Sequence, residues 1–313
     1  MNTTIYAPAS IANVGVGFDL LGAALAPIDG TRLGDCVSIS EGNQGLQFSC
    51  SGPWQHKLPA DSRKNIVLQC AEYFLAQLPA DRQPAGLNIE LNKNLPVGSG
   101  LGSSASSVVA AFVALNEFFG NFVAPNHLLL MMGDFEGRVS GSVHYDNVAP
   151  AFLGGMQLML QAAGRVCESI PVFEDWFWVV AYPGISLPTA EMRALLPPQY
   201  DRAVTIDYGR NLGAFIHASY RHDQQLAAAV LKDVLAEPYR SPSIPGFVEA
   251  RNAMTGLGML ATGISGSGPT IFSVTDNPDL AEKARQWLDQ NFLKNSEGFS
   301  RVCRIDESGA RRL

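Results

Sequence analysis

The chain has 313 residues, of which 47% are hydrophobic and 16% are charged. This length predicts one large domain or two of ordinary size, and the apolar content suits a packed core rather than a disordered chain. The formal net charge of −7 argues against nucleic acid or an anionic membrane as a partner. An anionic substrate would need a local positive site.

The start of the chain gives no sign of a targeting segment. The apolar stretch from Ile11 to Ile28 contains Asn13, Asp19 and several glycines, and no basic segment precedes it, so we do not expect a signal peptide. No run of about eighteen apolar residues occurs, so no membrane-spanning helix is expected. The five cysteines are scattered and form no Cys-x-x-Cys pair, which favours buried thiols in a reducing, cytoplasmic compartment.

The first half of the chain predicts alternating strands and helices. DCVSIS, residues 35–40, has strand character, and residues 65–78 place apolar side chains at helical spacing. Apolar and polar residues alternate over 87–92, which is the period of a half-buried strand. Residues 104–118 return to helical spacing and are followed by Gly120, so the unit is a strand, a glycine-rich loop and a helix.

The second half continues with mixed elements. Residues 128–136 predict a helix, and residues 154–160 and 176–184 predict strands on either side of a turn near Gly164. The remaining segments predict three helices, a strand pair around a glycine turn, and a last helix: 212–220, 224–235, 246–255, 259–276 and 279–292. This order indicates an α+β fold of two domains, divided near Gly164.

The segment from Pro96 to Ser107 reads PVGSGLGSSASS and is almost all backbone. Glycines allow positive φ angles and close approach of the backbone to a ligand. The helix that follows adds unpaired N–H groups and the positive end of its dipole. Such a loop is suited to bind phosphate, although a tight, well-capped turn explains the same residues. In either case Ser103 or Ser104 is expected to be the N-cap of the helix.

Two common phosphate-binding patterns do not fit this loop. The Walker pattern requires Gly-Lys-Ser/Thr, and the loop contains no lysine. The dinucleotide pattern requires G-x-G-x-x-G, whereas the spacing here is G-x-G-x-G. That pattern also expects an acid at the end of a second strand, and the nearest acid, Glu117, lies inside the predicted helix.

Three further segments are dense in glycine and polar residues: PASIANVGVGFDLLG at 8–22, EGRVSGSVHYDNVAP at 136–150 and TGISGSGPTIF at 262–272. Together with PVGSGLGSSAS they closely resemble the three signature motifs of the GHMP kinases. The resemblance runs from Tyr6 to about Phe272, which is nearly the whole chain.

This resemblance implies a two-domain GHMP kinase fold of the α+β class. Residues 1–165 would form an N-terminal α+β domain that carries the phosphate loop and binds ATP. Residues 166–313 would form a C-terminal ferredoxin-like domain. Members of the family are often homodimers, so a homodimer is expected.

Within the family, four segments resemble the members that phosphorylate L-homoserine: ANVGVGFDLLG, HYDNVAP, TAEMRALLP and EPYRSPSIPG. The implied reaction is ATP + L-homoserine → ADP + O-phospho-L-homoserine, a step toward threonine. Phosphoryl transfer of this kind depends mainly on positioning and on neutralising charge.

The resemblance also implies where ATP and Mg²⁺ bind. The residues that would hold the triphosphate are Pro96, Val97, Gly98, Ser99, Gly100, Leu101, Gly102, Ser103, Ser104, Ala105 and Ser106. Ser104 and Glu136 match the positions that bind Mg²⁺, an ion that prefers hard oxygen ligands. Read without the resemblance, Glu136 is a solvated acid near a helix end.

The substrate contacts follow from the same resemblance. Arg193 and Arg240 match the partners of the substrate carboxylate, for which a planar guanidinium is well suited. Asn13 and Asp19 match the acceptors for its ammonium group. Read alone, the two arginines are more often surface charges, and Asn13 and Asp19 favour a turn or a cap.

The sequence leaves the acceptor of the hydroxyl proton open. His144 and Asn147 match contacts near the reacting hydroxyl, and Asp146 aligns with the aspartate that accepts the proton in mevalonate kinase and galactokinase. That aspartate is paired with a lysine, and the first motif here, PASIAN, has none. We therefore favour the alternative, in which a phosphate oxygen takes the proton.

Two other functions fit part of this pattern. A GHMP kinase acting on another small molecule, such as mevalonate, would leave Asp19 without an ammonium partner. A non-catalytic GHMP-fold regulator that only binds nucleotide should have lost loop glycines or the metal-binding acid. Gly102 and Glu136 are both present, which argues against the regulator.

Overall fold

The structure, a computed structural model, describes residues 2–140 and 143–313, and the strands within these ranges form two sheets. The first sheet has the order β13-β1-β4-β6-β5. Its strands are β1 (Asn2–Pro8), β4 (Gly34–Glu41), β5 (Gly45–Ser51), β6 (Gly86–Asn92) and β13 (Arg311–Arg312). Neighbouring strands are antiparallel except β5 and β6, which are parallel.

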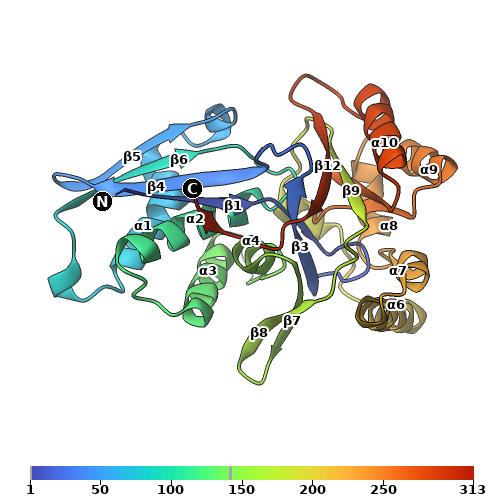
Figure 1. Cartoon of the computed structure of the whole chain (residues 1–313), viewed down its shortest axis with the longest axis horizontal. Helices are drawn as coiled ribbons and strands as arrows, with labels where there is room; N and C mark the ends of the chain where they lie inside the picture. Colours follow the sequence, from blue (N-terminus) through green and yellow to red (C-terminus); the bar gives the residue numbers. More distant parts are fainter. Residues whose placement is uncertain (1, 141–142) are drawn as a thin grey trace.

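Helices cover one face of this first sheet (Figure 1). They are α1 (Ile66–Leu75), α2 (Ser103–Phe118), α3 (Pro125–Ser140) and α4 (Val148–Leu153). The alternation of the strands explains the choice of face, because their apolar residues point toward the helices. The buried strand residues in this core include Val37, Ile39, Leu87, Ile89 and Leu91.

The second sheet has the order β10-β11-β9-β12-β3-β7-β8, and β2 pairs with β3. Its strands are β2 (Ser10–Ala12), β3 (Leu21–Pro27), β7 (Met156–Ala162), β8 (Arg165–Ile170), β9 (Phe177–Tyr182), β10 (Ala261–Ile264), β11 (Ile271–Thr275) and β12 (Phe299–Ile305). The helices of this half are α5 (Thr189–Ala194), α6 (Arg202–Arg221), α7 (Gln224–Val230), α8 (Glu237–Arg240), α9 (Phe247–Leu257) and α10 (Pro278–Asn291).

Strands β9 to β12 form the predicted ferredoxin-like unit. They pair in antiparallel fashion in the order β10-β11-β9-β12. β10 and β11 therefore lie on one side of β9, and β12 lies on its other side. Helices separate the first strand from the second, and α10 separates the third from the fourth. Both faces of β9 are covered, because Val179 packs in the same core as α9 and α10, and Trp178 in that of α6 and α7.

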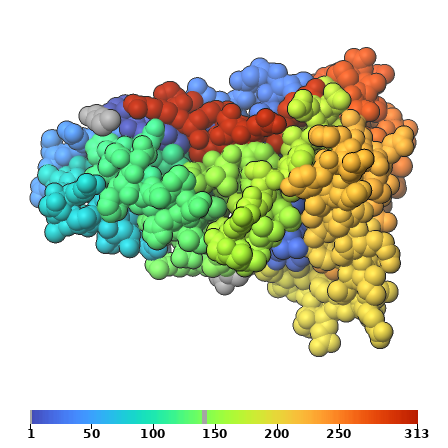
Figure 2. Space-filling model, turned by 60° about the horizontal axis from the view of Figure 1, so that its bottom comes forward, coloured from blue at the N-terminus to red at the C-terminus, as the bar shows by residue number. Residues whose placement is uncertain are grey.

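The chain ends by crossing between the two sheets. β12 lies in the second sheet, and β13 pairs with β1 in the first. Figure 2 shows this last segment, in dark red, lying along both halves of the molecule. β3 and β7, from the predicted N-terminal domain, also belong to the second sheet. The division at residue 165 stays a prediction.

Most of the expected elements are present, and the differences have local causes. The turn at Gly164 joins β7 to β8, a strand that was not predicted, because the polar segment RVCESI lacks a clear apolar alternation. α6 begins at Arg202 rather than 212, since its first turns are exposed and show no apolar face. α7 ends at Val230, five residues earlier than expected.

The structure also tests the expectations about the cysteines and about membrane-spanning helices. All five cysteines are free, and Cys36, Cys70 and Cys303 are buried as expected. Cys50 and Cys167 are only partly buried, because both lie on strands at or beside a sheet edge. Within residues 2–140 and 143–313, no helix is both long and apolar enough to cross a membrane.

Candidate active site

The glycine-rich loop connects the end of β6 to α2 and has its carbonyl groups turned into the protein. Five consecutive carbonyls, those of Val97, Gly98, Ser99, Gly100 and Leu101, accept hydrogen bonds of 2.6–3.1 Å from Ser186 Oγ, Leu187 N, Thr270 N, Ser265 Oγ and Ser10 N, respectively. Because these acceptors are satisfied from one side, the loop can present N–H groups on the other, together with the first turn of α2.

The loop glycines are required by the protein that surrounds them. Gly98, Gly100 and Gly102 have φ angles of 66°, 81° and 64°, which disfavour other residues. A Cβ atom on Gly100 would lie 2.5 Å from the Ser265 carbonyl oxygen and 2.8 Å from that of Gly268. This Cβ would therefore meet the turn formed by residues 265–268, so the loop would have to move.

The helix cap differs from the expected one. Gly102 is the N-cap of α2, in the left-handed conformation, and it makes no side-chain capping bond. Ser103 and Ser104 instead lie in the first turn, so the prediction that one of them is the N-cap is wrong. A cap without a side chain leaves the first amides of the helix open to a ligand.

Ser104 and Glu136, the pair expected to bind Mg²⁺, lie together although they are 32 residues apart. Ser104 Oγ donates a hydrogen bond of 2.9 Å to Glu136 Oε2. Burial raises the pKa of Glu136, while the bond from Ser104 and the charge of Lys93 act to lower it. A hydroxyl and a carboxylate beside the loop are a donor set that fits Mg²⁺. Within the described residues, no group of three His, Cys, Asp or Glu side chains could hold a metal ion.

The residues expected to bind the substrate form one charged cluster. Arg193 donates two hydrogen bonds to Asp19, from Nη1 to Oδ2 at 3.1 Å and from Nη2 to Oδ1 at 2.9 Å. His144 Nδ1 lies 3.9 Å from Asp19 Oδ1, and burial lowers the pKa of this histidine. Two guanidinium groups lie near the Phe18 ring, that of Arg193 at 5.9 Å and that of Arg240 at 5.4 Å from its centroid.

Asn13 and Arg240 both hold the turn at Gly266. Its carbonyl oxygen accepts hydrogen bonds from Asn13 Nδ2 at 3.1 Å and from Arg240 Nη1 at 2.9 Å. Arg240 is buried, and burial lowers its pKa. Asn13 Oδ1 also accepts from the amide of Asp19 at 3.0 Å, which fixes Asp19 in a left-handed conformation. Asn13 therefore positions the carboxylate of Asp19.

Asp146 and Asn147 are neighbours in sequence but have different surroundings. Asn147 Oδ1 accepts a hydrogen bond of 2.8 Å from Ser10 Oγ and would lie 2.8 Å from a Cβ on Gly102, so it lies against the end of the phosphate loop. Asp146 is buried, and burial with the nearby charge of Asp19 raises its pKa to about 7. Asn147 is thus the one of the two that contacts the loop.

The chain is similar to proteins of known family and structure. Residues 65–155 match the family model for the GHMP kinases N terminal domain, and residues 213–294 match the model for GHMP kinases C terminal, together more than half of the chain. A homoserine kinase from Cytophaga hutchinsonii ATCC 33406 has 30% identity and a TM-score of 0.90, over 100% of this chain and 97% of its own.

The chain belongs to the GHMP kinase family. It therefore catalyses phosphoryl transfer from ATP to the hydroxyl of a small molecule. A mevalonate kinase from L. major, solved with R-mevalonate, is 17% identical with a TM-score of 0.71 over 97% of this chain and 96% of its own. Mevalonate kinase from Methanococcus jannaschii is 12% identical, with a TM-score of 0.73 over 97% and 98%. At these identities the similarity to the two mevalonate kinases shows a shared fold and no more.

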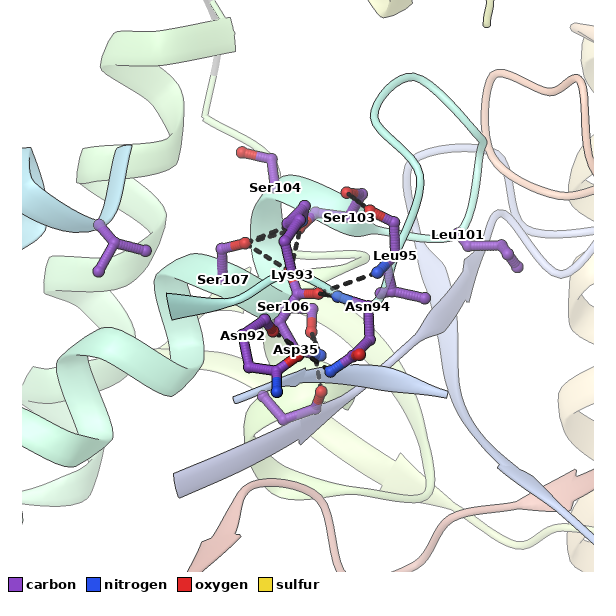
Figure 3. A network of polar contacts seen from close by, with 12 residues as sticks. Asp35, Asn92, Lys93, Asn94, Leu95, Leu101, Ser103, Ser104, Ser106 and Ser107 are labelled. Carbon is purple, nitrogen blue, oxygen red and sulfur yellow. Dashed lines mark hydrogen bonds and ion pairs between the residues drawn. The ribbon is translucent and has the colours of Figure 1, made fainter. Parts of the chain in front are cut away.

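One basic residue behind the loop of this GHMP kinase was not predicted from the sequence. Lys93, three residues before Pro96, forms a buried ion pair with Asp35 behind the loop (Figure 3). Its position in the strand alternation could have indicated burial, because Lys93 continues the inward-facing series of Leu87, Ile89 and Leu91. A lysine on the buried face of a strand requires a partner.

Proposed function

We propose that this GHMP kinase transfers the γ-phosphoryl group of ATP to the side-chain hydroxyl of L-homoserine and releases O-phospho-L-homoserine. The observation that carries the proposal is the charged cluster of Asp19, Arg193 and Arg240, which the turn at 265–268 links to the phosphate loop. It offers an acid for an ammonium group and guanidinium groups for a carboxylate, which are the two charges of an amino acid. The similarity to the C. hutchinsonii homoserine kinase supports it.

The substrate would bind by exchanging partners with the ion pair. Its carboxylate would take the guanidinium of Arg193, with Arg240 nearby, and its ammonium would take the carboxylate of Asp19. A zwitterion satisfies both groups after the pair is split. A hydroxy acid without an ammonium group, such as mevalonate, would leave Asp19 beside the buried part of the site without a cation, which is unfavourable. The cluster therefore favours an amino acid over mevalonate.

The loop and the first turn of α2 would bind the triphosphate of ATP. Ser104 and Glu136 would hold Mg²⁺, and the remaining ligands of the ion would be water and phosphate oxygens. The ion supplies neutralisation of the phosphate charge when it is bound. Ser104 comes from α2, which packs on the first sheet, and Glu136 from α3, which packs on α2, so their positions are set by the fold.

The substrate hydroxyl would attack phosphorus near Asn147, which lies against the end of the loop. Its Oδ1 accepts a bond from Ser10, so the amide is oriented and its N–H group can donate to the attacking oxygen. We assign the proton of the hydroxyl to a phosphate oxygen rather than to Asp146, because Asp146 is buried and Asn147 occupies the position at the loop. His144 was expected near the reacting hydroxyl; because it lies near Asp19 in the structure, we assign it to the ammonium end instead.

Other parts of the proposal rest on the family alone. A homodimer in the cytoplasm stays a prediction. A regulator that binds nucleotide without turnover is disfavoured, because the glycines of the loop and the Ser104–Glu136 pair are both present.

The test is a coupled ADP-release assay with matched substrates. L-homoserine should have the highest kcat/KM. 4-Hydroxybutyrate lacks the ammonium group, 3-amino-1-propanol lacks the carboxylate, and each should lose about tenfold or more, since one charged hydrogen bond contributes about 1.5–3 kcal/mol. Mevalonate serves as the competing alcohol. A higher kcat/KM for mevalonate than for L-homoserine would refute the proposal.

A variant ties the result to the cluster. Asp19→Asn should lower kcat/KM for L-homoserine by about tenfold or more, because the ammonium loses its acid. The same change should leave 4-hydroxybutyrate unaffected or improve it, because Arg193 is released from its internal partner. Equal losses for both substrates would show that Asp19 does not recognise the ammonium group.

A further inference from the structure

A buried ion pair lies behind the phosphate loop, outside the set of groups expected to touch ATP or the alcohol. Lys93 is 2% exposed and Asp35 is 0% exposed. Cys36 and Asn92 are the pair at one end of the ladder between β4 and β6. Asp35 directly precedes Cys36, and Lys93 directly follows Asn92. Replacing a buried ion pair by apolar residues is often neutral or stabilising, so stability alone is a weak explanation for it.

The ion pair contacts both ends of the loop (Figure 3). On the side that leads into the loop, Asp35 Oδ1 accepts hydrogen bonds from the amides of Asn94 at 2.8 Å and Leu95 at 3.0 Å. On the side that leaves it, Lys93 Nζ donates to the Ser103 carbonyl at 3.1 Å and to Ser107 Oγ at 3.0 Å.

Two further bonds close the arrangement. Ser107 Oγ donates to Asp35 Oδ2 at 2.5 Å, and Ser103 Oγ donates to the Leu95 carbonyl at 3.3 Å. Every ammonium hydrogen of Lys93 therefore has an acceptor, because its third bond goes to Asp35. The residues joined in this way, 94–95 and 103–107, are those that flank the loop on each side.

We propose that the Asp35–Lys93 ion pair is a positioning device that fixes both ends of the phosphate loop and so sets the affinity for nucleotide. The proposal rests on the assignment of this loop to the triphosphate. A loop with fixed ends is ordered before the ligand binds, and the ligand does not bear the entropic cost of ordering it.

Two variants test the ion pair. Lys93→Met removes the bonds to Ser103 and Ser107 but leaves Asp35 as a buried unpaired charge, which threatens folding. Lys93→Met combined with Asp35→Asn leaves no buried charge, and the asparagine oxygen can still accept from Asn94 and Leu95. The double variant is therefore the one that decides the matter.

The readouts separate positioning from general stability. In the folded double variant, calorimetry should show the Kd for ADP with Mg²⁺ raised about tenfold or more, the usual effect of removing groups that orient direct ligands. Hydrogen exchange of the amides in residues 97–106 should become faster. The KM for the alcohol substrate should change less than twofold.

Arg311→Met is the matched control. Asp306 is also a buried carboxylate that accepts from two amides, those of Ser308 and Gly309, and it is paired with Arg311 where the chain passes from β12 to β13. The control variant should lose stability and keep the ADP Kd and the exchange of residues 97–106 unchanged.

The outcomes are distinguishable from failure of the loop assignment. A folded double variant that binds ADP within twofold of the unmodified protein overturns the positioning role. So does a control variant that weakens ADP as much as the double variant does. If Gly100→Val binds nucleotide normally, the loop assignment itself fails; if only Gly100→Val weakens binding, the loop is correct and the ion pair does not position it.

Discussion

Replacing Asp146 by asparagine separates the two routes open to the proton of the substrate hydroxyl. Asp146 is 5% exposed, and its pKa is raised from 3.8 to about 7, first by burial and then by the charge of Asp19. Its backbone packs against Gly22 of β3, while Asn147 contacts the loop. We therefore expect Asp146 to support the segment rather than to accept the proton.

The raised pKa gives the magnitude of a stability effect. Between pH 3.8 and about 7 the folded protein holds a proton on Asp146 that the unfolded chain has lost, so the group favours folding at acidic pH and this contribution is lost as pH rises through 7. From pH 5 to pH 8 the loss is roughly 2.5 kcal/mol, at 1.36 kcal/mol per unit. The asparagine of Asp146→Asn does not titrate. Between pH 5 and pH 8 the free energy of unfolding of this variant should therefore fall by that amount less than the free energy of unfolding of the unmodified protein.

Urea unfolding at pH 5 and pH 8 measures the stability effect, and coupled ADP release over the same pH range measures catalysis. If a phosphate oxygen takes the proton, kcat for Asp146→Asn should fall less than about tenfold and keep the shape of its pH profile. A general base contributes about 10²–10⁴-fold, and its loss would also remove the limb near pH 7. A thousand-fold fall in kcat with intact folding and substrate binding would refute the reasoning.

Three other changes test separate parts of the site. Gly100→Val should abolish ATP binding, because the new side chain would collide with residues 265–268; near-normal affinity by calorimetry in a folded variant would contradict the loop assignment. Glu136→Gln should lower kcat and raise the Mg²⁺ concentration needed for half activity, and full activity at ordinary Mg²⁺ would remove Glu136 from the metal site. Arg193→Met should raise the KM for L-homoserine about tenfold or more and leave the KM for ATP unchanged, because it removes the guanidinium proposed for the substrate carboxylate, which in the structure pairs with Asp19. Equal rises in both constants would exclude a carboxylate-specific contact.

The sequence predicted the elements whose apolar pattern is strong. The periodicity over 65–78 and 104–118 corresponds to α1 and α2, and the alternation over 87–92 corresponds to β6. The glycine loop could be found because its composition has a direct physical meaning, and the family followed from the motifs. β8 and the first half of α6 were missed because they are exposed, and an exposed element has no apolar face to reveal it.

The contacts within the site could not be predicted in the same way. The bonds from Ser104 to Glu136 and from Arg193 to Asp19 join residues 32 and 174 positions apart, and a single sequence contains no measure of such proximity. The resemblance named these residues but not their pairing. Lys93 lies outside the motif, and only its position in the alternation of β6 indicates that it is buried.

The turn at 265–268 shows what the fold adds to the motifs. From the sequence alone its glycines could be purely structural. In the structure, Ser265 Oγ donates to the Gly100 carbonyl at 2.6 Å, and the Gly266 carbonyl accepts from Asn13 and Arg240. One short turn therefore contacts both the phosphate loop and Arg240 of the charged cluster. Because each contact fixes a different half of the site, the relative placement of phosphate and alcohol depends on this turn, although none of its side chains needs to touch either ligand.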